Sequence, residues 1–189
     1  MFIKTIYFSG GSFYELQKVF SRIKGVVNVT AGYINAGMTA PMYMQILNGN
    51  IDAVMGIKIE YNPKKIDLST LLDVLFTVID PYSEDKQGKC SGRMYRTGIY
   101  YCENEDLPII QLYMNFIISK GKAPVITTAN ITVNDPSSGK TYRKCYVETK
   151  KLENFYAAEE IHQNYLHKNP TKKTFIDFAR LKELSIIDN

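Results

Sequence analysis

The stretch Thr5-Ile6-Tyr7-Phe8-Ser9-Gly10-Gly11-Ser12-Phe13-Tyr14 decides the fold, because it joins a strand pattern to a helix pattern through a glycine turn. Thr5 to Phe8 is a short β-branched and aromatic run, which favours a strand. Ser9-Gly10-Gly11 breaks that run, and Ser12 is a residue type that caps helices. The apolar positions that follow recur at helical spacing: Phe13, Leu16, Phe20 and Ile23. The stretch therefore predicts a helix start at Ser12, where free amides and the helix dipole favour an anion.

Strand and helix patterns alternate through the next hundred residues. Strands are expected at Val26–Tyr33, Ile57–Tyr61 and Arg96–Cys102, and helices at Met42–Leu47, Leu68–Ile79 and Pro108–Ser119. Asp67 is expected to cap the helix that follows it. Because no internal repeat or low-complexity segment interrupts the pattern, residues 1–189 are interpreted as a single α+β domain.

The pattern changes in the last third of the chain. Two alternating runs, Val125–Val133 and Thr141–Glu148, are joined by the turn-forming residues Asn134–Lys140, which predicts a β-hairpin. Ala157–Lys168 is expected to form a final helix, and residues 171–189 a helical C-terminal tail.

Composition excludes several classes of function. The formal charge is +4 without a clustered basic run, so nucleic-acid binding is not expected. The three cysteines form no Cys-x-x-Cys pair and no metal-ligand spacing with the two histidines, so neither a metal site nor a disulfide framework is expected. No apolar run is long enough to cross a bilayer, and the N-terminus lacks a signal-peptide pattern. We expect a cytoplasmic monomer with no membrane association.

Four segments of the chain together resemble the peptide methionine-S-sulfoxide reductase A (MsrA) family in both order and spacing. They are Tyr7-Phe8-Ser9-Gly10-Gly11-Ser12-Phe13-Tyr14, Gly32-Tyr33 through Met42-Tyr43, Gln87-Gly88 through Tyr95-Arg96, and Phe155-Tyr156-Ala157-Ala158-Glu159-Glu160-Ile161-His162-Gln163-Asn164-Tyr165-Leu166. The resemblance implies that family's two-layer α/β sandwich, with a central mixed sheet and the site at the start of the first helix. Residues 131–148 are then interpreted as an inserted β-hairpin.

Ser12 stands at the position where the family has its nucleophilic cysteine. In that family the cysteine attacks the sulfoxide sulfur and becomes a sulfenic acid, which a thiol then reduces. The resemblance implies thiol-dependent reduction of methionine-S-sulfoxide, in peptides or as the free amino acid. It implies no bound cofactor, with thioredoxin or another thiol as the reductant. A serine hydroxyl is a hard, barely ionised nucleophile that cannot form the recycling disulfide, so we predict very weak or absent activity.

The resemblance assigns retained binding roles to four aromatic residues. Tyr43 and Tyr95 match the tyrosines that hold the sulfoxide oxygen, and Phe13 matches one wall of the methyl pocket. Tyr14 replaces the tryptophan of the same pocket.

Three polar groups of the family's site are replaced in an ungapped alignment. Met55 falls at the acidic glutamate and is expected to line the substrate site as an apolar wall, while Ala53 falls at a histidine and Cys90 at the helping aspartate. A gapped alternative puts Asp52 at the acid position, and Cys90 could be a relocated thiol.

The sequence leaves several alternatives open. Ser12 is either a helix cap or a direct participant in the site, and it is either a natural or an engineered replacement, although the additional losses favour natural divergence. His162 is interpreted as structural. The chain could be a divergent reductase, a non-catalytic binding module for a methylthio or methylsulfinyl group, or a repurposed enzyme that uses Ser12, Cys90 or Asp52.

Overall fold

A computed structural model of the protein describes residues 2–118, 125–127, 130–132, 144–183 and 185–187. The strands are β1 Lys4–Ser9, β2 Val26–Ile34, β3 Val54–Tyr61, β4 Lys86–Gln87, β5 Cys90–Ser91, β6 Gly98–Tyr101, β7 Val125–Thr127, β8 Asn130–Thr132, β9 Glu148–Lys151 and β10 Phe155–Ala157. The α-helices are α1 Phe13–Phe20, α2 Tyr43–Leu47, α3 Leu68–Val78, α4 Leu107–Ile118, α5 Tyr165–Lys168 and α6 Phe178–Glu183. The 3₁₀ turns in the described part of the chain are η1 Arg93–Tyr95, η2 Asn104–Asp106 and η4 Glu160–His162.

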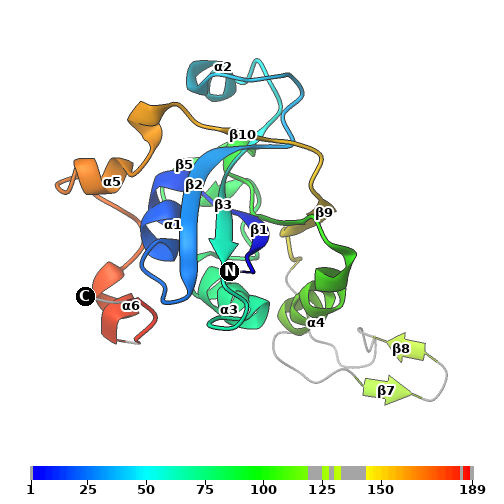
Figure 1. The fold of residues 1–189 in the computed structure, drawn as a ribbon. Helices are drawn as coiled ribbons and strands as arrows, with labels where there is room; N and C mark the ends of the chain where they lie inside the picture. The colour runs from blue at the N-terminus through cyan, green and yellow to red at the C-terminus, as the bar shows by residue number, and fades with distance from the viewer. Residues whose placement is uncertain (1, 119–124, 128–129, 133–143, 184, 188–189) are drawn as a thin grey trace.

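Six of the strands form one central sheet in the order β10-β2-β3-β1-β6-β9 (Figure 1). Neighbouring strands are antiparallel except for β6 and β9, which run parallel, so the sheet is mixed. The strand–turn–helix unit predicted at the N-terminus is confirmed, and the helix-capping role predicted for Asp67 is confirmed because its carboxylate accepts the Thr70 amide at 2.8 Å.

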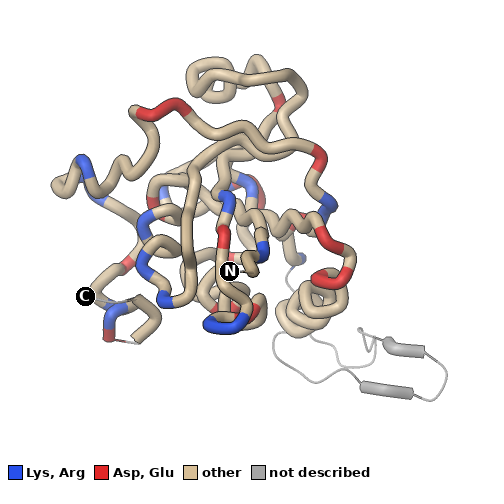
Figure 2. Tube along the Cα trace, in the orientation of Figure 1, with Lys and Arg blue, Asp and Glu red and all other residues tan. Residues whose placement is uncertain are grey.

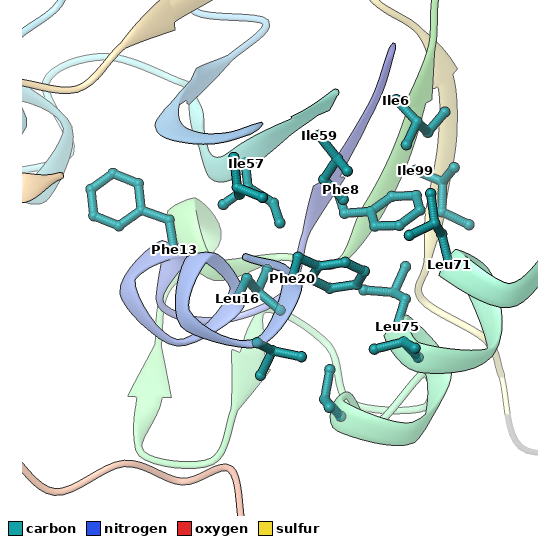
Figure 3. Packing of buried hydrophobic residues seen from close by; sticks show 14 of the residues in the cluster. Ile6, Phe8, Phe13, Leu16, Phe20, Ile57, Ile59, Leu71, Leu75 and Ile99 are labelled. Atoms are coloured by element: carbon teal, nitrogen blue, oxygen red, sulfur yellow. The ribbon is translucent and has the colours of Figure 1, made fainter. Parts of the chain in front are cut away.

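The main core lies between the sheet and the helices α1 and α3. Ile6 and Phe8 of β1 point to this side, where Phe20 of α1 meets the Phe8 ring edge-on at 5.5 Å between centroids (Figure 3). Because side chains alternate along a strand, Tyr7 points to the other face and joins a smaller cluster there with Ile34, Val54 and Tyr100. This layered arrangement confirms the predicted α+β class and fixes α1 against the sheet.

The predicted hairpin is wrong where the structure describes it. The run Val125–Val133 was expected to be one strand, but Val125–Thr127 pairs antiparallel with Asn130–Thr132, so the pairing is within that run. Residues 133–143 of the proposed insertion at 131–148 lie outside the described part. Of the second run, the described residues 144–147 are not in a strand, and Glu148 begins β9, which extends the central sheet as the neighbour of β6.

The predicted helix at Ala157–Lys168 is confirmed only at its end, where α5 spans Tyr165–Lys168. Phe155–Ala157 pairs with β2 as an edge strand, and the turn η4 and the short α5 follow. Asn164 adopts a left-handed conformation (φ 52°) that interrupts any continuous helix, and the Gln163 side chain bonds to the backbone of Ala31 instead. Tertiary hydrogen bonds therefore overrode a helix-like pattern.

The C-terminal tail packs on the outer side of α1. Of the residues 171–189, only Phe178–Glu183 is helical among those described, so the predicted helical tail is confirmed in part. Ile176 and Leu181 are buried in the main core, and the Lys18 ammonium lies 4.8 Å from the centroid of the Phe178 ring. Among the described residues, no helix is long and apolar enough to cross a membrane.

Candidate functional site

The turn before α1 brings the helix start against the η1 segment. Gly11 has a φ of +77°, and a side chain there would begin 2.8 Å from Cβ of Gln87, so this tight turn requires glycine. The Gly11 amide donates to the Tyr95 carbonyl at 3.0 Å. The turn thus places Tyr95 beside the first residues of the helix.

Ser12 is the N-cap of α1. Its backbone is extended, and its hydroxyl oxygen accepts the Tyr14 amide at 3.3 Å. The capping role predicted from the sequence is confirmed. A hydroxyl that already accepts a backbone amide holds the helix start, because it satisfies one of the orphan donors there.

An aromatic cluster surrounds the helix start on one side, and we use this name for Phe13, Tyr14, Tyr33, Tyr43 and His162. The Phe13 side chain is fully buried, and its ring contacts those of the other four at centroid distances from 4.8 to 6.3 Å. Tyr43 stacks on His162 at 4.3 Å. Residues from α1, β2, α2 and η4 therefore form one aromatic surface.

The hydroxyls of this cluster are held in defined hydrogen bonds. The Tyr14 hydroxyl lies 2.7 Å from Nδ1 of His162, and burial, followed by the neighbouring Tyr43, raises the pKa of Tyr14 well above its ordinary value. The Tyr33 hydroxyl donates to Glu159 at 2.7 Å, and the Tyr43 amide donates to the other Glu159 oxygen at 2.9 Å. The His162 contacts agree with the structural role predicted for it.

The tyrosine hydroxyls near the aromatic cluster thus stay protonated at neutral pH. Burial is also the main cause that raises the pKa of Tyr95 to about 12, with contributions from Tyr43 and Cys90. Desolvation opposes ionisation of Glu159, but hydrogen bonds from the Tyr43 amide and the Tyr33 hydroxyl outweigh it and hold the pKa of that carboxyl below its usual value. At neutral pH Tyr95 is therefore a hydrogen-bond donor, whereas Glu159 is an ionised acceptor.

A polar cavity of about 290 Å³ lies on the other side of the helix start. We use the name polar cavity for the space lined by Ser12, Glu15, Cys90, Phe175 and their neighbours. The Phe175 amide donates to Glu15 at 2.6 Å, so the C-terminal tail is tied across this cavity to α1. Two side chains that could carry chemistry, Ser12 and Cys90, line the same cavity.

The surroundings of Glu15 and Cys90 in the polar cavity favour the protonated, neutral form of each side chain. Burial raises the pKa of Glu15 to about 7, although the amides of Phe175 and Ile176 oppose the shift. Burial and then the Glu15 carboxyl raise the pKa of the Cys90 thiol, and a hydrogen bond from the Ser12 amide opposes this. Cys90 is consequently adjacent to the backbone of Ser12, but its thiol is less acidic than an ordinary one.

Met55 and Asp52 differ in burial. Met55 is in β3 opposite Tyr33, and its side chain is buried in the main core. Asp52 is exposed, and its carboxylate contacts Arg96 at 3.1 Å and Arg93 at 3.4 Å. Desolvation opposes ionisation of Asp52, but these two arginines outweigh it and lower its pKa. An ion-paired carboxylate of low pKa suits charge pairing better than proton donation at neutral pH.

Two of the site's polar groups were not assigned to the site from the sequence. Glu15 has the spacing of an ordinary first-turn helix acid, and only the packed tail buries it. Glu159 belongs to the motif near the C-terminus, yet its contacts to Tyr33 and Tyr43 depend on three separate segments. Among the described residues, no group of three His, Cys, Asp or Glu side chains is arranged to hold a metal ion.

The fold and this site define a class of protein: an α+β sandwich with an aromatic surface and a capped helix start at one edge of a mixed sheet. Comparisons with known proteins identify the class further. The sequence model of the family "Peptide methionine sulfoxide reductase" matches residues 4–134 and 125–186. The MsrA of Mycoplasma genitalium is 39% identical over 176 residues, which cover 93% of this chain and 99% of that protein.

Further relatives agree with this match. The MsrA of Clostridium tetani is 37% identical over 89% of this chain and 91% of its own length. The crystal structure of reduced Mxr1 from Saccharomyces cerevisiae superposes with a TM-score of 0.75 at 25% identity, covering 91% of this chain and 88% of that one. The chain belongs to the MsrA family of methionine sulfoxide reductases, and its fold is the MsrA-like fold expected from the resemblance.

Proposed function

We propose that this chain binds methionine-S-sulfoxide, in peptides or as the free amino acid, and that Ser12 by itself reduces it very weakly or not at all. Ser12 occupies the helix start, yet its hydroxyl oxygen is engaged by the Tyr14 amide. An oxygen nucleophile also cannot be recycled through a disulfide, which is how a thiol-dependent reductase regains its starting state.

The aromatic cluster supports the binding half of this proposal. The half-buried stacked pair Tyr43 and His162, which packs against the buried Phe13 ring, offers apolar ring surface for a methyl group. Tyr43 and Tyr95 are proposed to donate hydrogen bonds to the sulfoxide oxygen, a strong acceptor. Because burial keeps Tyr95 protonated across the neutral range, its donor is present at physiological pH.

Loss of the family's acidic residue supports the second part of the proposal, which is very weak or absent reduction. Met55 presents an apolar side chain at the position that the resemblance assigns to the acidic glutamate. Asp52 is paired with Arg93 and Arg96, and we propose that it acts as their counter-ion rather than as the acid. A departing oxygen that receives no proton raises the barrier to reduction, since general acids typically contribute about 10²–10⁴-fold.

A dithiothreitol-coupled assay on a peptide containing methionine-S-sulfoxide tests the proposal. Purified native chain, Ser12→Cys and Ser12→Ala are compared at equal concentration, and a melting-temperature shift with the same peptide measures binding. We expect binding by all three proteins and an increase of at least about 100-fold in turnover for Ser12→Cys alone. Turnover by the native chain that falls in Ser12→Ala would show that the serine is itself competent.

A second candidate function follows from the position of Cys90 beside the Ser12 amide in the polar cavity. In this reaction the Cys90 thiol takes the sulfoxide oxygen, becomes a sulfenic acid and releases the thioether. Two equivalents of an external thiol then return Cys90 to the thiol, with water and a disulfide as products. The raised pKa of Cys90 predicts a slow reaction that accelerates as the pH rises.

Trapping with dimedone, which alkylates sulfenic acids, distinguishes the second candidate from the first. We expect a dimedone adduct on Cys90 after incubation with methionine-S-sulfoxide, and loss of any residual turnover in Cys90→Ser. Cys102→Ser is the matched control, because Cys102 is also a partly buried free cysteine but contacts the smaller cluster on the other face of the sheet. Residual turnover that persists in Cys90→Ser would eliminate the relocated-thiol reaction.

We further propose that the protein works in the cytoplasm with thioredoxin or another thiol as its reductant if it turns over. The three cysteines are free in the structure, which suits a reducing compartment. Fractionation of the source cells, with immunodetection of the protein, tests the location.

A further inference from the structure

Cationic side chains gather where α1, α5 and the C-terminal tail meet. The polar cavity is lined there by Lys89, Lys172 and Lys173. A second cavity of about 520 Å³ is lined by Lys18, Arg22 and Lys168, together with His167. Figure 2 shows basic positions of α1, α5 and the tail along this side of the molecule. We call the six lysines and arginines of the two cavities the basic face.

The two cavities are neighbours, and the aromatic cluster borders both. Tyr14 and Leu166 line each of them. The Tyr14 ring contacts Phe13, and its other side stacks on Tyr165 at 4.3 Å between centroids. A bound peptide that places one side chain on the aromatic cluster would therefore reach one or both cavities of the basic face within a few residues. An extended peptide advances roughly 3.3 Å per residue.

The charge on this face is not balanced locally. Six of the 23 lysines and arginines line the two cavities, whereas Glu15 is the one aspartate or glutamate among the described residues that does. Burial raises the pKa of Glu15 to about 7, so this carboxyl neutralises the face incompletely at neutral pH. The basic face consequently keeps a positive field that an anionic partner would complete.

Most of these cations are also free to bind. Lys168 is paired with Glu160 at 3.2 Å, and Lys18 lies over the Phe178 ring. Within the described part of the chain, no carboxylate lies at ion-pair distance from the other four, which are Arg22, Lys89, Lys172 and Lys173. Lysine is a flexible point charge, so such a surface selects for negative charge without demanding one fixed geometry.

We propose that the basic face binds aspartate and glutamate residues that flank methionine sulfoxide in a peptide, so that acidic peptides are this protein's preferred ligands. This inference rests on the proposed binding of methionine sulfoxide at the aromatic cluster. An acidic peptide fits better than a nucleic acid, because the net charge of the whole chain is only +4 and the cationic cavities border an aromatic surface.

Fluorescence anisotropy with a set of labelled peptides tests the proposal. Three peptides carry methionine-S-sulfoxide between aspartates, between serines or between lysines, and a fourth carries alanine between aspartates, all with the same fluorophore. We expect the acidic sulfoxide peptide to bind on the order of tenfold more tightly than the serine peptide at low salt, because several exposed ion pairs add up. The difference should shrink strongly at about 0.5 M salt, where exposed charges are screened.

Charge-reversal variants locate the effect on the surface. We expect K172E/K173E and K18E/R22E each to reduce the acidic preference several-fold. K64E/K65E is the matched control, because it reverses two exposed lysines that line a different cavity beside α3. Equal losses in K64E/K65E would mean that only net charge matters, and this would overturn the assignment to the basic face.

The peptide set separates failure of this inference from failure of the proposed function. Equal binding of the aspartate and serine sulfoxide peptides would overturn the acidic preference while leaving sulfoxide binding intact. Equal binding of the alanine and sulfoxide peptides, with the acidic preference retained, would count against sulfoxide recognition and not against the basic face. Tighter binding of a single-stranded oligonucleotide of matched charge would overturn the choice of an acidic peptide.

Discussion

The two sides of the α1 start have different chemistry. On one side the aromatic cluster is closed by ring contacts and by the hydroxyl bonds of Tyr14 and Tyr33. On the other side the polar cavity holds Ser12, Glu15 and Cys90 under the C-terminal tail. On the first side lie Phe13 and Tyr43, to which the family resemblance assigns binding roles, whereas on the second lie Ser12 and Cys90, which we propose stand in place of residues assigned to chemistry. Under the proposed function, binding and reaction depend on different sides of a single helix start, so a substitution can alter one without the other.

Phe13→Ala is the strongest way to break the aromatic side. Phe13 is fully buried and contacts four rings of the cluster, so its removal leaves a cavity. We expect a loss of about 3–5 kcal/mol in the free energy of unfolding, measured by urea denaturation. Phe13→Leu is the control and should lose much less. Similar losses for both variants would mean that the rings are not closely packed around this position.

Glu15→Gln tests the polar side through pH. The pKa of Glu15 is raised by burial to about 7 from its ordinary value of 4.5, so the folded chain binds this proton more tightly than the unfolded chain. The contribution of Glu15 to the free energy of unfolding should therefore be largest below about pH 4.5, fall as the pH rises and level off above about pH 7, by on the order of 3 kcal/mol. The glutamine variant should lack this component in denaturant titrations between pH 5 and pH 8. An identical pH dependence in both proteins would contradict the buried carboxyl.

Tyr14→Phe sharpens the boundary between the two sides. The change removes the hydroxyl bonded to His162 but keeps the ring that stacks on Tyr165. We expect about 1 kcal/mol of lost stability and weaker sulfoxide binding by only a few-fold, since the partner imidazole can turn toward water. Calorimetric titration with the sulfoxide peptide measures the second effect. Abolished binding would mean that this hydroxyl contacts the ligand directly.

Asp52→Asn should have the smallest effect. Asp52 is exposed and pairs with the exposed Arg93 and with the buried Arg96, which keeps a second carboxylate partner in Glu148. We expect a change below about 1 kcal/mol in stability and no change in residual reductase turnover, measured by thermal denaturation and by the dithiothreitol assay. A large loss of turnover would restore Asp52 as the acid and contradict its assignment as a counter-ion.

The sequence predicted much of the fold because its strongest signals are local. Apolar spacing located α1 and α3, and the capping roles of Ser12 and Asp67 depend on amides only two or three residues away. The prediction of a helix at Ala157–Lys168 was wrong before Tyr165 because the hydrogen-bond partners of that stretch are distant in sequence. β2 supplies the hydrogen bonds that make Phe155–Ala157 a strand, and the Gln163 side chain crosses to Ala31.

The sequence by itself determined that a glycine turn leads into a serine-capped helix, and that the serine cannot perform thiol chemistry. Those conclusions follow from backbone geometry and from the properties of one atom, and neither depends on the rest of the chain. Only the tertiary structure placed Cys90 against the Ser12 amide, buried Glu15 under the tail and aligned the basic face beside Tyr14. The physical reason is that burial and electrostatic coupling act between segments far apart in sequence, so they exist only once the sheet and helices have packed.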